Sequence, residues 1–360
     1  ETTNIDADIT FGNSGQLNIG TGTLEISSIA FINVGGTINI DNGATLGGDF
    51  INYDGPTLTN NGSITASNFT MLGGPAQQIN GSGSIANLTI NNGSNVNLGS
   101  NHTVTSVLTL TNGNLVTGSN NLVMTDVSSV VGGNNSSHVN GNVQRQFTNA
   151  NPGSYLLPIG DGTRYTPLLL GPSINIGGDG AVTAFTTAND HGDILNSGID
   201  GSKSVNRTWT IINNSLNFSE CDVTFNYSAA DVDGAATQSN FVLAKLDGGT
   251  WTLPAGVVPG VNSLYVGNLT SFSEFQIGEP LVTTPAAALN FDGVNDQVVI
   301  SNAGIDLTNK SFSVEMWLKR NSATSYDVAF SQGTAGADNQ LLHIGFSNDN
   351  EFIFNFFGGP

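Results

Sequence analysis

The stretch Leu88-Thr-Ile-Asn-Asn-Gly93 and its near copy Leu108-Thr-Leu-Thr-Asn-Gly113 stand 20 residues apart. The pairs Asn42-Gly43, Asn61-Gly62 and Asn80-Gly81 precede them at steps of 19 residues. A period of about 20 residues matches one coil of a β-solenoid, whereas the strands of a β-sandwich have no reason to repeat in register. Each Asn-Gly pair supplies a turn in which a positive φ is tolerated. The repeat therefore predicts a β-solenoid-like region over residues 1–142.

Stacked coils place equivalent side chains above one another. Leu, Ile and Val are then expected to fill the interior, while Asn over Asn forms ladders of hydrogen-bonded amides. Such a solenoid is a rigid spacer, and its exposed faces are where a ligand would bind. A β-sandwich with many Asn-Gly hairpins is the alternative for this region.

From about Asn142 the sequence pattern changes: the short repeats give way to longer runs in which apolar and polar residues alternate. These runs include 143–147, 153–170, 181–185, 207–212, 223–227, 241–246 and 272–277. Their number and spacing predict one antiparallel β-sandwich over residues 143–279. Trp209 and Trp251 are expected in its core or rim, and sugar stacking by Trp251 is the less favoured interpretation. Residues 280–287 contain two prolines and no alternation, which is typical of a linker.

The charge balance excludes several classes of partner. The chain has 8 basic and 28 acidic residues, a net charge of -20, so it has no basic stripe to neutralise nucleic acid. An anionic membrane surface is disfavoured for the same reason. Cys221 is the only cysteine, which excludes an internal disulfide, and it is expected to pack as a small hydrophobic residue.

The start of the chain carries no Met and no signal peptide, and no apolar run is long enough to span a bilayer. Direct membrane insertion is therefore not expected. With the acidic Asn/Thr/Gly-rich composition and the lack of disulfides, these features suggest a mature or excised piece of an exported bacterial protein, located outside the cell at its surface.

Residues 80–280 resemble a known class of surface protein. The coils run into Ser136-Ser-His-Val-Asn-Gly141 and Tyr155-Leu-Leu-Pro-Ile-Gly160, and the region closes at Thr270-Ser-Phe-Ser-Glu-Phe-Gln-Ile-Gly278. This order resembles large repetitive surface proteins of Bacteroidota that are exported by the type IX system. The resemblance implies adhesion or gliding motility. A type IX C-terminal sorting domain is not visible in the sequence.

The C-terminal stretch carries a second resemblance. Leu289-Asn-Phe-Asp-Gly-Val-Asn-Asp-Gln-Val298, followed by Phe312-Ser-Val-Glu-Met-Trp-Leu318, is similar to the first strands of concanavalin A-like, laminin-G or pentraxin-type jelly rolls. Gln297 stands where that family commonly has Tyr. Only 72 residues lie between Leu289 and Pro360, about half of what such a jelly roll needs. Residues 288–360 are therefore expected to be an incomplete domain, with the natural protein continuing beyond them.

A calcium site is the only metal site that the sequence suggests. Asp292 and Asp296 flank a Gly-Val-Asn turn, and their carboxylates can share one hard cation with backbone carbonyls. The alternative is a turn in which the same carboxylates bind local amides. Asp231-Val-Asp-Gly234 and Asn189-Asp-His-Gly-Asp193 are weaker candidates that are interpreted first as turns.

No catalytic residues emerge from the sequence. Glycoside hydrolysis needs two opposed carboxylates, and Glu315 stands alone in its strand-like run. The histidines are scattered without the spacing of a zinc site; they are His102, His138, His191 and His343.

These observations predict a non-enzymatic, all-β adhesin fragment whose stalk presents a lectin-like jelly roll to extracellular glycans or surfaces. Other copies of the chain and surface-motility proteins are further expected partners. Two alternatives stay open. One is a segment of an extracellular filament, and the other is an accessory region of an exported polysaccharide-degrading enzyme whose catalytic domain lies elsewhere.

Overall fold

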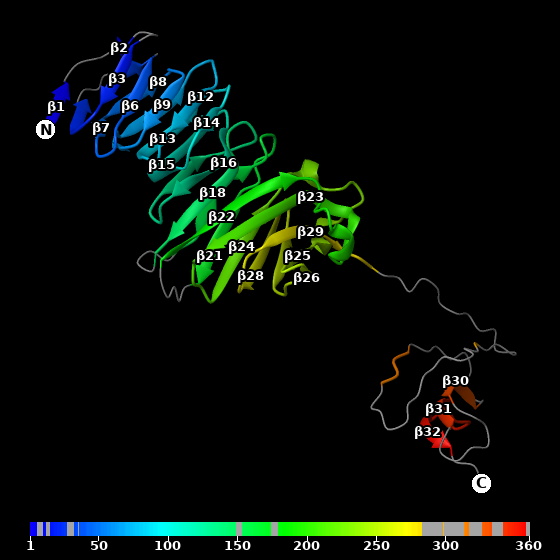
Figure 1. Cartoon of the computed structure of the whole chain (residues 1–360). Helices are drawn as coiled ribbons and strands as arrows, with labels where there is room; N and C mark the ends of the chain where they lie inside the picture. The colour runs from blue at the N-terminus through cyan, green and yellow to red at the C-terminus, as the bar shows by residue number, and fades with distance from the viewer. Residues whose placement is uncertain are drawn as a thin grey trace. The chain divides into compact units, whose positions relative to one another are not determined.

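The computed structural model (Figure 1) describes residues 1–5, 10–11, 15–26, 32–34, 36–148, 153–173, 179–282, 298, 313–316, 326–332 and 341–357. Strands make up 62% of the chain and helix 3%, so the protein is all-β as predicted. The chain divides into two compact units, Glu1–Ala286 and Ala287–Pro360. In the described part of the smaller unit, β30 (Asp327–Gln332), β31 (Leu341–Phe346) and β32 (Phe352–Phe357) form an antiparallel sheet.

The first unit begins as a β-solenoid of about seven turns, which confirms the fold predicted from the repeat. Each coil contributes one strand segment to each of three parallel sheets, or faces. The first face contains β1 (Thr2–Ile5), β4 (Thr23–Ile26), β7 (Thr45–Gly48), β10 (Ser63–Ile64) and parts of β13 (Ser84–Asn91), β15 (His102–Asn112) and β16 (Leu115–Met124). Parallel pairing throughout excludes the alternative of a sandwich built from hairpins.

The other two faces repeat the same arrangement. The second contains β2 (Thr10–Phe11), β5 (Ile32–Val34), β8 (Phe50–Tyr53), β11 (Asn68–Leu72), the remaining parts of β13 and β15, and β17 (Ser129–Gly132). The third contains β3 (Gln16–Ile19), β6 (Thr37–Ile40), β9 (Thr57–Asn60), β12 (Gln77–Asn80), β14 (Val96–Leu98), the first parts of β16 and β18 (Val139–Phe147), and β20 (Ile159–Gly160). The second part of β18 continues the first face beside β16.

Aliphatic side chains stack in register inside the coils. Phe69, Leu88 and Leu108 pair across neighbouring strands of the second face, and all three are buried. Outside, Asn39 Nδ2 donates to Asn18 Oδ1 at 2.7 Å, an amide pair of the expected kind. Because the same side chain type recurs at the same place, each coil buries the apolar face of the next.

The Asn-Gly pairs occupy two different corners of the coil. Gly43 and Gly81 lie between the third and the first face and have φ of 80° and 88°. Gly113 lies between the second and the third face, with φ of 76°. Contrary to the expectation, Gly62 and Gly93 do not adopt a positive φ; in the turn that contains Gly93, Asn95 does so instead, at 77°.

Gly113→Ala is expected to destabilise the solenoid by at least about 2 kcal/mol, because the left-handed backbone disfavours a Cβ and that Cβ would collide with the carbonyl oxygen of Asn92. Gly43→Ala is the matched control, since Gly43 has nearly the same φ but open space around it. It should cost only about 1 kcal/mol in denaturant unfolding. Equal losses for the two variants would show that stacking at this corner adds no constraint.

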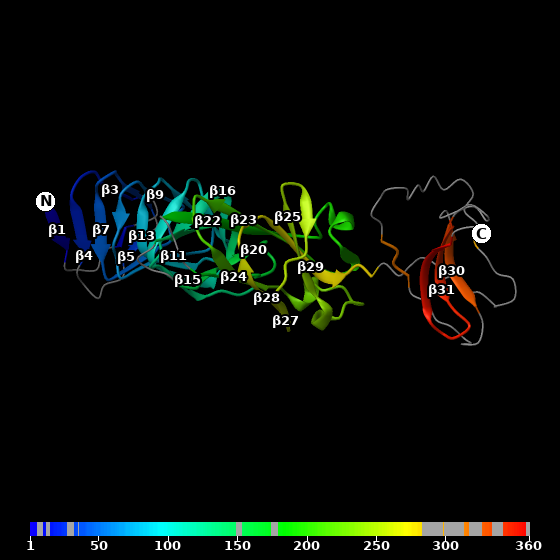
Figure 2. The ribbon, with the colours of Figure 1, turned by 90° about the horizontal axis from the view of Figure 1, so that it is seen from below.

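The solenoid continues into the sandwich without a break in the sheet (Figure 2). β18 pairs in parallel with β16 and, along its second part, antiparallel with β22 (Gly180–Ala188). The first sandwich sheet then extends through β23 (Ile199–Asn214), β29 (Glu274–Pro280), β25 (Val242–Asp247) and β26 (Thr250–Thr252). The second sheet contains β19 (Tyr155–Leu157), β21 (Leu168–Ser173), β24 (Glu220–Asn226), β28 (Ser263–Leu269) and β27 (Val257–Gly260).

Aromatic rings join the two sandwich sheets. Phe225 of the second sheet lies between Trp209 and Phe275 of the first, with ring centroids 5.4 Å and 5.2 Å away, and all three are fully buried. Trp209 therefore belongs to the core. Cys221 is also buried, and burial raises the pKa of its thiol to about 12. The described sandwich loops contain the short 3-10 helices η1 (Ile194–Asn196), η2 (Ala229–Asp231) and η3 (Gln238–Asn240).

Candidate functional site

The residues predicted to bind calcium, Asp292 and Asp296, lie outside the described residues. Glu315 lies in the short described stretch 313–316, where its side chain is exposed. In the part of the chain that the structure describes, no three His, Cys, Asp or Glu side chains gather in an arrangement that could hold a metal. Calcium at Asp292 and Asp296 therefore stays a prediction.

The two weaker acidic segments meet each other in the structure. Ser204 Oγ donates to Asp190 Oδ1 at 2.6 Å and lies 3.3 Å from Asp233 Oδ2. Asp190 also accepts from Gln276 at 2.9 Å, and Asp233 accepts from Asn206 at 2.7 Å. Burial, and then the charge of Asp233, raise the pKa of Asp190. The contacts fix two loops onto the first sandwich sheet, which agrees with the interpretation of both segments as turns.

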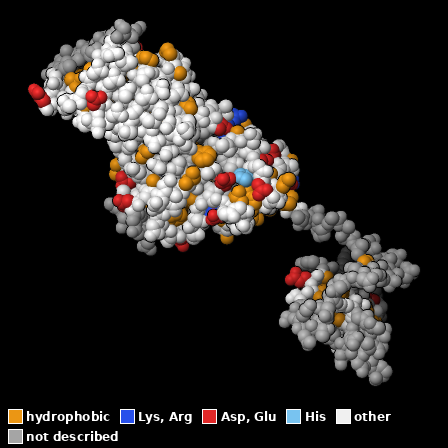
Figure 3. All heavy atoms as spheres, in the orientation of Figure 1, with side chains coloured by type: hydrophobic (Ala, Val, Ile, Leu, Met, Phe, Trp, Pro, Cys, Tyr) orange, Lys and Arg blue, Asp and Glu red, His pale blue; other side chains and the backbone are white. Residues whose placement is uncertain are grey.

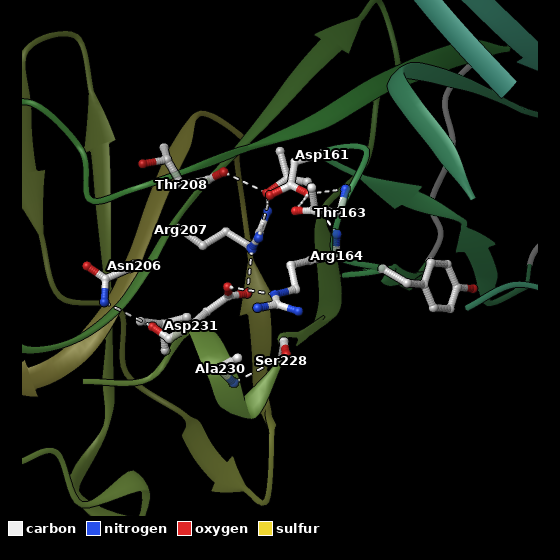
Figure 4. Close-up of polar contacts among 12 residues, drawn as sticks. Asp161, Thr163, Arg164, Asn206, Arg207, Thr208, Ser228, Ala230 and Asp231 are labelled. Atoms are coloured by element: carbon white, nitrogen blue, oxygen red, sulfur yellow. Dashed lines mark hydrogen bonds and ion pairs between the residues drawn. The ribbon is translucent and has the colours of Figure 1, made fainter. Parts of the chain in front are cut away.

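A buried ion cluster joins the loop after the last solenoid strand to the first sandwich sheet and to η2 (Figure 4). Arg207 on β23 is fully buried and points between Asp161, which follows β20, and Asp231, at the end of η2. Its Nη2 lies 2.8 Å from Asp161 Oδ2 and its Nε 3.0 Å from Asp231 Oδ2. Arg164 approaches Asp231 more loosely, at 3.8 Å, with 39% of its side chain exposed. Each charge in this cluster has an opposite partner, as burial requires.

The protonation of Asp161 follows from this cluster. Burial alone would raise the pKa of its carboxyl group. Arg207 and the backbone amides of Thr163 and Arg164 donate to the carboxylate, and together they hold the pKa well below its ordinary value. Asp161 is therefore ionised at neutral pH. A permanently charged, saturated carboxylate is suited to holding the structure together rather than to proton transfer.

A second arrangement lies on the outer surface of the first sandwich sheet, around Trp251. Trp251 Nε1 donates to Asp193 Oδ2 at 2.9 Å, and the Trp251 ring stands edge-on to His191 with centroids 5.0 Å apart. His191 Nε2 lies 2.6 Å from Glu274 Oε2. Leu253, which comes directly after β26, is 49% exposed. We call Trp251, Leu253, His191, Asp193 and Glu274 the Trp251 patch.

Figure 3 shows how charged, hydrophobic and neutral side chains are distributed over the molecular surface. Over β23 and β29, pale blue histidine atoms lie between red acidic atoms, with orange hydrophobic atoms beside them. Most of the displayed surface of this unit is white, since neutral polar side chains and backbone cover it. The Trp251 patch itself combines an aromatic ring with exposed Leu253 and with the carboxylates of Asp193 and Glu274.

A hollow lined by Thr252, the residue after Trp251, contains a basic side chain in place of carboxylates. This hollow of about 380 Å³ is lined by Lys245, Thr252, Pro254, Ala255, Gly256, Gly267, Asn268, Leu269 and Thr270. Lys245 Nζ is the one cation of this lining, and it is 2.9 Å from Asp247 Oδ2 and hydrogen-bonded to Ser271. The ammonium group is thus held by an ion pair and a hydrogen bond at the edge of the hollow.

Sequence reasoning singled out Trp251 but not the residues that surround it. Asp193 is 58 residues from Trp251 along the chain, and His191 is 83 residues from Glu274. Antiparallel pairing and the loop that contains η1 bring them together, and no local spacing signals such a contact. Phe185 is linked to Glu274 across the sheet, because both pair with Thr210 of β23. The sequence predicts Phe185 only as part of a strand.

In the described ranges, no helix is long and apolar enough to cross a membrane. Comparison of the chain with protein-family models, curated proteins and solved structures finds no match.

Proposed function

We propose that this chain is a non-catalytic part of a bacterial cell-surface adhesin, in which the solenoid and sandwich form a stiff stalk and the protein binds extracellular glycans or surfaces. The observation that supports this best is the continuity of one sheet from β16 through β18 to β22. A domain joined by a flexible linker would lack such shared pairing. A stalk that bears load benefits from a joint without a hinge.

Side chains reinforce the same joint. Arg145 of β18 is almost fully buried, and its Nη2 donates to the carbonyl oxygen of Ser128 at 2.6 Å. Its guanidinium stacks over the ring of Tyr155 in the second sheet, 4.1 Å from the centroid. Burial lowers the pKa of Arg145 to about 10, so it keeps its charge at neutral pH. This cation–π contact and the Arg207 cluster tie the solenoid to both sheets.

The composition suits a surface protein that must avoid unspecific contacts. Only 10% of residues are charged, yet the net charge is -20. A negative chain stays soluble and does not adhere to nucleic acid, while neutral hydroxyl and amide groups remain available for selective hydrogen bonds. Binding would then depend on shape and hydrogen bonding more than on charge.

Display of the full chain on a non-adherent bacterium is expected to increase retention on glycan-coated surfaces under flow. Retention should be nearly unchanged by added salt, because charge pairs contribute little. No retention on any glycan, together with particles that lengthen with concentration in ultracentrifugation, would contradict adhesion and favour the filament alternative. Release of sugar fragments by the purified chain would instead show an enzyme.

A further inference from the structure

We infer that the Trp251 patch is a binding site for neutral hexose chains, so that the sandwich itself contacts the glycan. This inference rests on the proposed function and assigns the ligand class and the residues that would bind it. A hexopyranose ring has one face of C–H groups and an edge of hydroxyl groups. It is therefore complementary to a surface that offers an aromatic ring next to hydrogen-bond acceptors.

The aromatic ring of the patch is fixed before any ligand arrives. Pairing of β26 with β25 holds the backbone of Trp251, its Nε1 is anchored on Asp193, and His191 stands against the ring. A ring held in this way loses little rotamer freedom when a ligand stacks on it. Leu253 and Leu195, 49% and 86% exposed, add apolar surface two residues along the chain from Trp251 and Asp193.

The acceptors lie at the right place for sugar hydroxyls. Glu274 has 42% of its side chain exposed, while its partner His191 is 18% exposed, so the carboxylate reaches solvent next to the ring. Asp193 is held by Trp251 and Asn196 and also lies at the surface. Hydrogen bonds from hydroxyl groups to carboxylates are charge-assisted, and they are stronger than neutral ones.

The sign of these groups selects among saccharides. Asp193 and Glu274 are both acidic, and the whole chain carries a net charge of -20. Polyuronates and sialylated glycans would bring like charges together and be repelled. His191 Nδ1 accepts from the backbone amide of Asp193, so its Nε2 donates to Glu274 and takes up one side of that carboxylate. Neutral hexoses fit this patch best.

The row across the sheet gives the site length. Trp251 pairs with Leu246, which lies opposite Glu274, and Glu274 lies opposite Thr210. Thr210 in turn pairs with Phe185, a half-buried aromatic residue. Four strand spacings of about 4.8 Å separate the two rings by roughly 19 Å. This length accommodates several sugar units, so an oligosaccharide should bind more tightly than a monosaccharide.

The test is calorimetric titration of the full chain with neutral gluco- and manno-oligosaccharides, a polyuronate and chitosan oligomers. Trp251→Ala is expected to weaken binding of the neutral oligosaccharides at least tenfold, and Glu274→Gln severalfold. Tyr265→Ala is the control: Tyr265 is 38% exposed on the opposite sheet, and its loss should leave affinity unchanged. Melting curves verify that each variant is folded, and Glu274→Gln keeps the test valid if Trp251→Ala does not fold.

Each outcome has a defined meaning. Neutral binding that survives both Trp251→Ala and Glu274→Gln would overturn this site, while adhesion of the displayed chain would still support the proposed function. Binding to the polyuronate, or binding to chitosan alone that vanishes in salt, would overturn the ligand class. Absence of any saccharide binding, together with absence of retention under flow, would reject both proposals.

Discussion

Replacement of Arg207 by methionine is expected to lower the free energy of unfolding of the first compact unit by about 3–5 kcal/mol. Methionine has a similar length but no charge. The variant leaves Asp161 and Asp231, whose side chains are only 10% exposed, without the guanidinium that compensates them. Thr186 Oγ1 loses its bond to Arg207 as well, at 3.2 Å. Denaturant unfolding at neutral pH measures the loss.

Arg164→Met is the matched control, because Arg164 contacts the same Asp231 from a half-exposed position at 3.8 Å. Surface ion pairs of this kind contribute about 0–1 kcal/mol, so this variant should stay close to the wild type. If Arg207→Met were as stable as Arg164→Met, the buried cluster would not hold the joint. A Leu or Met core would then serve equally well.

As the pH falls from 6.5 to 4, His102 is expected to lower the free energy of unfolding by about 3 kcal/mol. His102 is buried inside the solenoid, and burial lowers its pKa to about 4. The Asn60 amide is oriented by two bonds: its Nδ2 donates to the carbonyl oxygen of Ser84, and its Oδ1 accepts from the backbone amide of Gly62. The same Nδ2 lies 3.1 Å from His102 Nε2 and donates to it. His102 Nε2 must therefore accept, and Nδ1 donates to Gly81. A second proton would place two donors against each other.

The sign follows from the two pKa values. In the folded chain the pKa lies below that of the unfolded chain, so the unfolded chain binds more protons between pH 6.5 and pH 4. Stability should fall as the pH drops through this window and lose nothing further from His102 below it. His138 should add to the slope, since burial lowers its pKa too and its Nε2 accepts from Gly162 at 3.0 Å.

His102→Gln isolates this contribution from that of the carboxylates. A glutamine amide can donate to Gly81 and accept from Asn60, but it cannot take up a proton in this range. The difference in unfolding free energy between pH 7.5 and pH 4 should therefore be smaller in the variant by about 3 kcal/mol. An unchanged difference would mean that His102 is not the titrating group.

The solenoid could be predicted from the sequence because each of its contacts repeats. Leu88 and Leu108 lie on neighbouring strands, and the 20-residue step between them is the step between coils. The sequence also places Asn-Gly pairs at intervals, but it does not distinguish the corner of Gly81 from that of Gly113. That distinction depends on which strand segment precedes each turn, which appears only once the coils are assembled.

The candidate site could not be predicted, because its contacts are long-range and occur once. Arg207 reaches Asp161 across 46 residues, and His191 reaches Glu274 across 83. Asp190 and Asp233 hold loops because both contact the hydroxyl group of Ser204. Ser204 lies in neither acidic segment, so the segments alone could not show this role. Sandwich strands could be located by their alternation, but their order in the sheet follows from packing of Trp209, Phe225 and Phe275.

Hydrogen exchange of the full chain, followed by mass spectrometry in the wild type and in Arg207→Met, tests most directly whether solenoid and sandwich form one body. We predict that amides of β15 and β16 in the solenoid lose protection together with those of β23 and β29 in the sandwich, by the same free energy. Loss of protection confined to β23 and β29, with β15 and β16 unchanged, would contradict a continuous stalk.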